Sequence, residues 1–190
     1  LLISFQFHFL FHFVGFLLTD VSSAYSSRKK AEAALYDIEN IYLLRHALAP
    51  GTGDPDNFDV NDCETQRNLS NAGRSQAIRI GKKLRDNLKI RPQVFSSQWC
   101  RCKETAKIAF EDYSTKNFLN SFYSLKYAKN KIKQVEQLND YIRQFKSDKN
   151  LIFVTHYVLI SEVLNYGPSS GEIVVSDKNF NIIGNIEIDF

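Results

Sequence analysis

Two short apolar runs in this chain end in the same way. Residues 40–45 (NIYLLR) lead directly into His46, and residues 151–155 (LIFVT) lead directly into His156. Each run is long enough for a strand but too short for most helices, and it lacks the alternation of a strand with one face in water. Such runs are typical of strands that are buried on both faces of a parallel sheet. Because helices must cover both faces of that sheet, this feature restricts the chain to α/β architectures.

Helical and strand-like patterns alternate along the rest of the chain. Helices are predicted at residues 26–37 (with a flexible lead-in as the alternative), 70–88, 99–110 and 132–145, and further strands at 93–97, 117–123, 172–176 and 181–189. Ser70 is the predicted N-cap of the longest helix, whose apolar residues recur on one face. The alternation predicts a three-layer α/β/α sandwich with a mostly parallel central sheet.

A long loop separates His46 from Ser70. It exceeds twenty residues and is rich in Gly, Pro and Asp, and loops of this length in compact domains usually serve function or act as lids. In parallel sheets, ligands bind beyond the carboxyl ends of the strands. Three predicted strand ends lead to His46, to the segment containing Arg101, and to His156. We therefore expect one shared site at that edge of the sheet.

The charge balance narrows the class of partner. The 190 residues, a length that favours a single domain, include 24 Lys and Arg against 21 Asp and Glu, a net charge of +3. This mildly basic balance suits an anionic small molecule. The lysines are too scattered to form the basic stripe that binds nucleic acid, which we exclude as a partner.

The first residues differ in composition from the rest. Residues 1–18 are largely apolar without Lys or Arg, and the small residues Ser22 to Ala24 follow. This pattern predicts a signal peptide at residues 1–24 and a folded domain at 25–190, with a periplasmic or secreted location in a bacterium. The alternative is an uncleaved anchor that faces the periplasm, because 18 apolar residues just span a bilayer. Contact with a membrane is expected only in that case.

The three cysteines leave a pairing open. In an oxidising compartment, Cys63 is expected to form a disulfide with either Cys100 or Cys102. The alternative is three free thiols in a reducing compartment. The spacing is not that of a zinc site, and no metal site is predicted.

Two arginines and two histidines at one sheet edge supply what phosphoryl transfer to an imidazole needs. A neutral ring nitrogen attacks phosphorus while cations hold the three equatorial oxygens. Guanidinium groups suit those oxygens because they stay charged and donate in a planar fork. A second histidine, when protonated, adds a further donor. This set requires neither a metal nor another cofactor.

Four segments, taken in order, resemble the motifs of a known family. They are Leu44-Arg45-His46-Ala47 after a strand; the stretch from Arg67 to Ala77, with its leucine, serine and glycine; the stretch from Ser97 to Ala106, with Ser97, Arg101, Thr105 and Ala106 in register; and Val154-Thr155-His156. Together they resemble branch 1 of the histidine phosphatase superfamily, over residues 40 to 165. Ala47 stands where the family has Gly, and Gln98 where it has Pro.

The resemblance implies a phosphoglycerate mutase-like fold and assigns roles to four residues. His46 would be the nucleophile that forms a phosphohistidine, and Arg45, Arg101 and His156 would bind the phosphate, with His156 also catalytic. Arg67 could reach the pocket from the loop, but a surface salt bridge is the expectation. Trp99 is expected in the core.

The general acid stays unassigned. Many family members place a carboxylate beyond the second arginine helix to protonate the leaving oxygen, but residues 118–123 contain none. Candidates lie elsewhere, at Glu111 and Asp112 and, in the long loop, at Asp54, Asp56, Asp59, Asp62 and Glu64. Without an acid, phosphohistidine, acyl phosphates and phosphoanhydrides are easier substrates than alkyl phosphates.

The resemblance therefore implies a hydrolase of the histidine acid phosphatase type that acts on a phosphomonoester or a related small phosphorylated compound. The long insert and the expected export favour a phosphorylated envelope sugar. Two alternatives stay open: a phosphohistidine phosphatase, and a non-catalytic phospho-ligand-binding protein on the same fold, which the missing acid favours. A mutase is disfavoured because nothing in the sequence indicates the closed site that retaining the phosphate requires.

Overall fold

The computed structural model describes residues 23, 25–34, 40–87 and 92–189. Within them one mixed sheet has the strand order β3-β2-β4-β1-β5-β6. The strands are β1 (Ile41–Arg45), β2 (Gln93–Ser96), β3 (Ser114–Thr115), β4 (Leu151–Thr155), β5 (Ile173–Ser176) and β6 (Ile182–Ile186). Strands β3, β2, β4 and β1 are parallel, whereas β5 runs antiparallel to β1 and β6 antiparallel to β5. The predicted mostly parallel sheet is confirmed.

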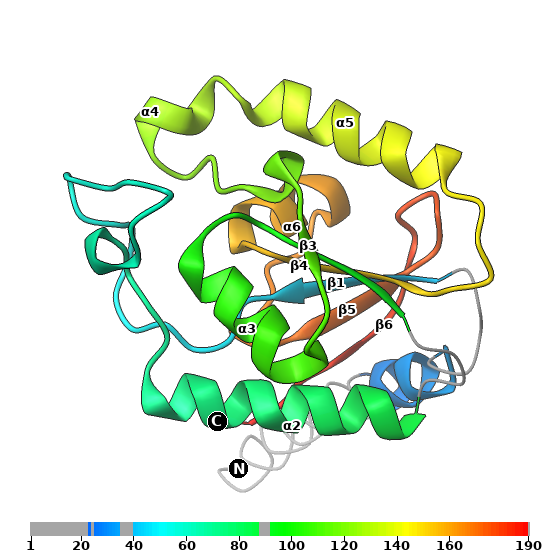
Figure 1. Cartoon of the computed structure of the whole chain (residues 1–190). Helices are drawn as coiled ribbons and strands as arrows, with labels where there is room; N and C mark the ends of the chain where they lie inside the picture. Colours follow the sequence, from blue (N-terminus) through cyan, green and yellow to red (C-terminus); the bar gives the residue numbers. More distant parts are fainter. Residues whose placement is uncertain (1–22, 24, 35–39, 88–91, 190) are drawn as a thin grey trace, which may run out of the picture.

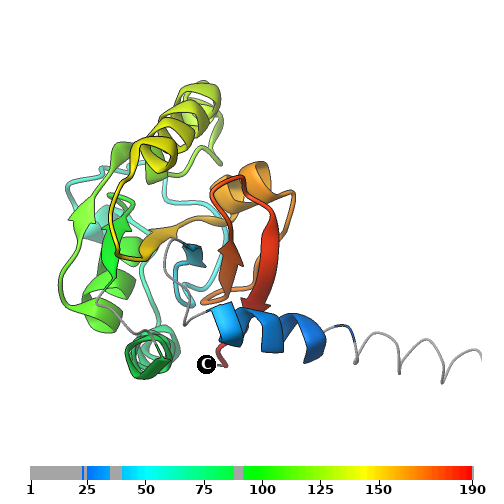
Figure 2. The same ribbon diagram turned by 90° about the vertical axis from the view of Figure 1, so that its right-hand side faces the viewer.

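Helices cover both faces of this sheet. They are α2 (Asn71–Asn87), α3 (Cys100–Phe110), α4 (Leu125–Ala128), α5 (Lys131–Gln144) and α6 (Tyr157–Leu164), with 3₁₀ turns η1 (Cys63–Thr65) and η2 (Asn117–Leu119). Residues 25–34 are also helical. Figure 1 shows α2 on one side of the sheet and α5 on the other, and Figure 2 shows the same layers after a turn of 90°. These layers make the three-layer α/β/α sandwich that the sequence predicted.

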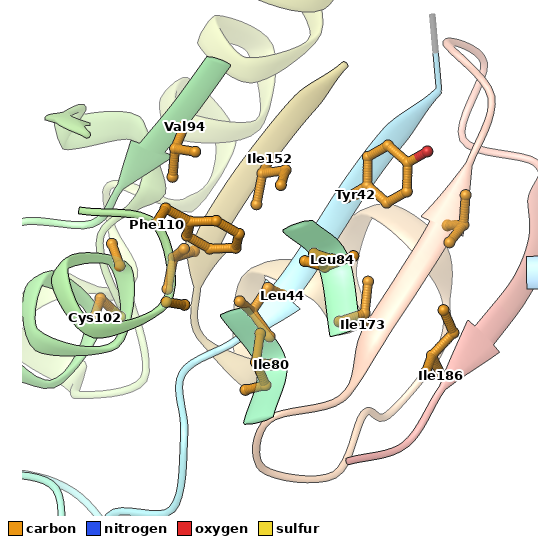
Figure 3. Packing of buried hydrophobic residues seen from close by; sticks show 14 of the residues in the cluster. Tyr42, Leu44, Ile80, Leu84, Val94, Cys102, Phe110, Ile152, Ile173 and Ile186 are labelled. Carbon is orange, nitrogen blue, oxygen red and sulfur yellow. The ribbon is translucent and has the colours of Figure 1, made fainter. Parts of the chain in front are cut away.

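The two cores are built by the alternation of side chains along each strand. Tyr42 and Leu44 of β1 point to the face covered by α2, α3 and the helix at residues 25–34. Ile41 and Leu43 point to the opposite face, against α5 and α6. Figure 3 shows the first core, where Leu44 lies near Ile80 of α2 and Tyr42 lies on the side of Leu84. The apolar runs are therefore buried on both sides, as their composition predicted.

The start of α2 fixes the long loop against the sheet. The Gly73 N–H donates to Ser70 Oγ at 3.0 Å, which confirms Ser70 as the N-cap. A Cβ at Gly73 would lie 2.1 Å from the carbonyl oxygen of Leu48. Only glycine allows so close an approach, so the chain that leaves β1 packs directly on the helix.

The predicted strand at residues 117–123 is wrong. Residues 117–119 form the turn η2, and the adjacent strand β3 has only two residues. The apolar side chains of Phe118, Leu119 and Phe122 pack into the core beneath α5 instead. The Gln134 amide donates to the carbonyls of residues 117, 118 and 120. A side chain thus satisfies backbone groups that a strand partner would otherwise bond.

Apart from residue 23, the predicted signal peptide or anchor lies outside the described residues, as do residues 35–37 of the helix predicted at residues 26–37. Among the described residues, no helix has both the length and the apolar character needed to cross a membrane.

Candidate active site

The carboxyl ends of three parallel strands converge on one site. His46 follows β1, His156 follows β4, and Arg101 lies in the first turn of α3, after β2. Arg45 pairs with Thr155 in the register of β1 and β4, so the two histidines lie side by side. Their ring centroids are 5.6 Å apart. In Figure 1 the arrow of β1 points toward the long loop, which lies at this end of the sheet.

His46 is held as a neutral ring with one free nitrogen. Its Nδ1 lies 2.8 Å from the carbonyl oxygen of Ala47, so Nδ1–H donates and Nε2 carries the lone pair. The Ala47 N–H donates to Thr105 Oγ1 at 3.0 Å, which anchors that peptide to α3. Burial, and then the charge of Arg101, lower the pKa of His46 well below its usual value. The ring is thus poised as a nucleophile.

His156 is oriented by a hydrogen-bonded chain behind the site. Its Nε2 lies 2.8 Å from Ser97 Oγ, which in turn donates to Asn120 Oδ1 at 3.2 Å. Since the serine proton goes to Asn120, His156 Nε2–H is the donor to Ser97. Burial and the charge of Arg101 lower the pKa of His156 well below its usual value.

Arg101 has one occupied edge and one unpartnered edge. Its Nη1 and Nη2 donate to the two carboxylate oxygens of Asp54, at 2.6 and 3.1 Å, and Nη1 also donates to the Arg67 carbonyl at 3.3 Å. Its Nε is buried and has no partner among the described residues. The side chain is only 3% exposed. The Nε–Nη2 edge therefore keeps two donors in the geometry that binds an oxyanion.

The guanidinium of Arg45 is held by a backbone carbonyl and by a tyrosine ring. Its Nη1 donates to the carbonyl of Pro168 at 2.8 Å, and its guanidinium lies 5.4 Å from the centre of the Tyr157 ring. Its Nε is buried without a partner in the described part of the chain. The carboxylate of Glu172 accepts from the Ser169 N–H and so fixes the turn that positions Pro168.

The expected surface salt bridge of Arg67 is wrong. The long loop folds back over the strand ends, and the half-buried Arg67 donates to the carbonyls of Ala49 and Gly53. Burial, and then the charge of Arg101, lower the pKa of Arg67 to about 10. A third guanidinium thus lies at the site. Its partners are backbone atoms, for which no residue type in the sequence gives a signal.

Asp54 is the loop carboxylate that the structure places in the site. Besides Arg101 it accepts from the Arg67 N–H and from Trp99 Nε1, each at 3.1 Å. Burial raises the pKa of Asp54, but the hydrogen bond and charge of Arg101 outweigh it and hold the pKa below its usual value. Asp54 is therefore an ionised partner of Arg101, and Trp99 packs in the core as expected. Glu111 and Asp112 do not line the pocket.

A pocket of about 420 Å³ collects these groups. All four residues predicted from the sequence line it, and the structure adds others: Asp54, Asp56, Arg67, Trp99, Tyr123, Lys126, Tyr127 and Tyr157. Three guanidinium groups and Lys126 line the pocket together with two carboxylates, Asp54 and Asp56, so the balance of charge favours an anion. Within the described residues, no group of three or more His, Cys, Asp or Glu side chains could hold a metal ion.

A disulfide joins the long loop to this pocket. Cys63 in η1 is bonded to Cys100, the residue before Arg101. This settles the pairing that the sequence left open. Cys102 is a free, buried thiol, and burial raises its pKa to about 12.

The sequence matches no protein-family model, and no curated protein matches it. Solved structures do match. A putative phosphohistidine phosphatase SixA from Agrobacterium tumefaciens is 20% identical with a TM-score of 0.56, over 80% of this chain and 99% of that one. A phosphoglycerate mutase from Thermus thermophilus is 16% identical with a TM-score of 0.57, over 79% and 99%. A putative alpha-ribazole-5'-P phosphatase from Escherichia coli is 14% identical with a TM-score of 0.54, over 81% and 97%.

These neighbours confirm the phosphoglycerate mutase-like fold that the sequence predicted. The likeness concerns the fold alone, and this is the fold that the four sequence motifs implied.

Proposed function

We propose that this chain is a phosphatase that hydrolyses a small phosphorylated compound through a phosphohistidine on His46. One observation carries the proposal. A neutral His46, with its lone pair on Nε2, lines the same pocket as two arginines whose buried Nε groups have no partner among the described residues. A phosphoryl group is an anion that needs both a nucleophile and cationic donors.

The reaction has two displacements. His46 Nε2 attacks phosphorus, a P–N bond forms, and the bond between phosphorus and the leaving oxygen breaks. Arg45 and Arg101 donate to the equatorial oxygens of the transition state. His156, whose Nε2–H is donated to Ser97, adds a donor at Nδ1 when it takes up a proton beside the bound phosphate. Water then attacks the phosphohistidine, inorganic phosphate leaves, and the electron pair returns to Nε2.

Asp54 does not supply the proton of the leaving group in this scheme. Its carboxylate is ionised and is engaged by Arg101. Asp54 acts as a positioning residue, because it occupies one edge of the guanidinium and so turns the other edge to the phosphate. The leaving oxygen takes its proton from solvent, so good leaving groups are favoured, such as aryl phosphates, acyl phosphates and phosphohistidine.

The substrate class and the location remain part of the proposal. The names of two neighbours, a putative phosphohistidine phosphatase and a putative alpha-ribazole-5'-P phosphatase, support a small phosphorylated substrate. In its more specific form, the proposal takes a phosphorylated envelope sugar as the substrate and a histidine acid phosphatase type of reaction. The disulfide between Cys63 and Cys100 supports export, because such bonds persist in oxidising compartments.

A second candidate, a phospho-ligand-binding protein that turns over slowly, is favoured by the ionised state of Asp54. The two are separated by hydrolysis of 4-nitrophenyl phosphate by the full chain. We expect turnover that EDTA does not reduce and that vanadate inhibits competitively. His46→Ala should lower kcat below about 1% of wild type, because removing a covalent nucleophile costs several orders of magnitude. Residual activity above that level, or inactivation by EDTA, would contradict the proposal.

A further inference from the structure

A buried carboxylate lies beside the active site without lining its pocket. Glu172 precedes β5, is 1% exposed, and is not among the residues that line the pocket. Its backbone pairs with the last residue of β1, since the Arg45 N–H donates to the Glu172 carbonyl at 3.1 Å. A buried charge is costly unless it is hydrogen-bonded and paired with an opposite charge. The partners of Glu172 therefore have to compensate for its burial.

The Glu172 carboxylate accepts three hydrogen bonds, all from uncharged groups. The Tyr166 hydroxyl donates to Oε1 at 2.5 Å, and the Asn185 amide donates to the same oxygen at 2.7 Å. The Ser169 N–H donates to Oε2 at 2.6 Å. Ser27 Oγ donates to Asn185 Oδ1 at 2.7 Å, which turns the amide nitrogen of Asn185 toward the carboxylate. These bonds fix both carboxylate oxygens but supply no positive charge.

The positive charge with which Glu172 interacts is that of Arg45. Burial lowers the pKa of Arg45, and the charge of Arg101 lowers it further, whereas Tyr157 and the charge of Glu172 counteract both effects. Within the described part of the chain, the hydrogen-bond partners of the Glu172 carboxylate do not include Arg45. The two charges therefore attract each other without direct contact, and the segment between them has to transmit any positional effect.

The turn between α6 and β5 connects this carboxylate to the Arg45 side chain. Ser169 donates its N–H to the carboxylate and accepts from the Glu172 N–H at 3.2 Å, so two hydrogen bonds hold the turn. The Pro168 carbonyl, at the start of the turn, accepts from Arg45 Nη1 at 2.8 Å. At the other end, the Gly171 N–H donates to the carbonyl oxygen of Arg45 at 3.2 Å. Movement of this turn would therefore displace the group that holds the Arg45 guanidinium.

We propose that Glu172 is a positioning residue that holds Arg45 for the phosphate, as Asp54 holds Arg101. The inference rests on the proposed function, because the phosphate that Arg45 binds is the one that His46 attacks. The carboxylate fixes the turn whose carbonyl binds one end of the guanidinium, and its charge favours the cation at that place. Because the guanidinium is planar, fixing Nη1 restricts the direction of Nε, which is buried and has no partner among the described residues.

Removing the charge of this carboxylate separates positioning from a simple electrostatic effect. Glu172→Gln has a similar size but removes one negative charge near a site for anions. If charge alone mattered, an oxyanion would bind the variant more tightly. The positioning role predicts the opposite. The Kd of vanadate, measured by isothermal titration calorimetry on the full chain, should rise by roughly 10-fold, and kcat/KM for 4-nitrophenyl phosphate should fall by a similar factor.

A double-mutant cycle tests whether the effect passes through Arg45. In an Arg45→Ala background, Glu172→Gln should no longer raise the Kd of vanadate, because the group that Glu172 positions is missing. Tyr166→Phe removes one hydrogen bond to the carboxylate but keeps its charge, so it should raise the Kd by roughly 3-fold when Arg45 is present. This milder variant takes the place of Glu172→Gln in the cycle if circular dichroism shows that the latter does not fold.

Glu187→Gln provides the matched control, because Glu187 is exposed, follows β6 and does not line the pocket. It loses the same charge and should leave the Kd of vanadate unchanged. An unchanged or lower Kd in Glu172→Gln, an equal rise in the Arg45→Ala background, or an equal rise in Glu187→Gln would overturn the inference. Absence of turnover of 4-nitrophenyl phosphate by the wild type would instead contradict the phosphatase proposal, and the vanadate titrations do not depend on that turnover.

Discussion

At the scale of single residues, the two edges of the Arg101 guanidinium have different tasks. The Nη1–Nη2 edge is saturated by Asp54 and the Arg67 carbonyl, whereas Nε has no partner among the described residues. Because a guanidinium is rigid and planar, fixing one edge fixes the direction of the other. Asp54 thus sets the orientation of Arg101, although the two residues are 47 positions apart and meet only in the folded chain.

Substitutions at this pair should separate charge from geometry. Arg101→Lys keeps the charge but loses the fork, so we expect kcat/KM to fall by at least roughly 100-fold. Asp54→Ala should raise both KM and the inhibition constant of vanadate by roughly 10-fold, because Arg101 loses its orientation, and Asp54→Glu should restore part of that loss. Steady-state kinetics with 4-nitrophenyl phosphate measures all three.

The exposed Glu64 of the same loop provides the control for Asp54. Glu64→Gln removes one negative charge outside the pocket and should leave the kinetics unchanged. Wild-type activity in Arg101→Lys would show that only charge matters at that position. An unchanged vanadate constant in Asp54→Ala would rule out its positioning role.

The two buried histidines should make stability depend on pH. The pKa values of His46 and His156 are lowered in the folded state, mainly by burial, whereas the unfolded chain titrates near 6.5. As pH falls below about 6.5, the unfolded state takes up protons that the folded state does not bind. The free energy of unfolding therefore has its full value above about pH 6.5 and decreases progressively as the pH falls below it.

Urea unfolding followed by circular dichroism at pH 8, 7, 6 and 5 would measure this loss. His156→Asn should flatten the dependence between pH 7 and 5. A free energy of unfolding that is constant over this range in the wild type would contradict the burial of neutral histidines.

How much of the site the sequence could predict depended on where each residue's partners lie. Arg45, His46, Arg101 and His156 were predictable because each follows a buried strand or lies in a short motif. Arg67 was not, because its partners are carbonyls that only the folded loop provides. Asp54 could be named as a candidate acid but not assigned, since its contact with Arg101 spans 47 positions.

At the scale of elements, the long loop after β1 behaves as part of the active site. It carries Asp54 and Arg67, packs on α2 through Gly73, and is joined to α3 by the disulfide. Its length marked it as functional, but its path depends on contacts that are distant in sequence. The prediction of a strand at residues 117–123 was wrong for a related reason. The apolar residues there are buried beneath α5 and do not pair with a neighbouring strand.

Loss of the disulfide should affect both stability and turnover. Closing a loop between residues 37 positions apart is worth about 3–4 kcal/mol in the chain-entropy model. Reduction should therefore lower Tm, and kcat/KM should fall because Asp54 and Arg67 lose their tether. Differential scanning calorimetry and kinetics with and without a phosphine reductant measure both effects.

The double variant Cys63→Ser/Cys100→Ser provides the control for the reductant. It should show the lowered Tm and kcat/KM without any reductant, and adding the reductant should change nothing further. An unchanged Tm in reduced wild-type protein would contradict a stabilising role of this bond.

At the scale of the whole molecule, the fold brings the site residues together, and no single sequence motif contains all of them. A mostly parallel sheet brings the ends of β1, β2 and β4 to one edge, so groups that are distant in sequence lie around one pocket. The alternation of buried strands and helices was enough to predict this arrangement. The walls of the active-site pocket that the long loop and α4 provide could not be predicted in this way, because they depend on loop paths.

The central claim is that His46 becomes phosphorylated during turnover. The most direct measurement is a rapid acid-free quench of the full chain with ³²P-labelled 4-nitrophenyl phosphate, followed by peptide mapping. The account predicts one label on His46, labile in acid and stable in base, that forms and decays at rates consistent with kcat. Full turnover with no such label, or a label on another residue, would contradict it.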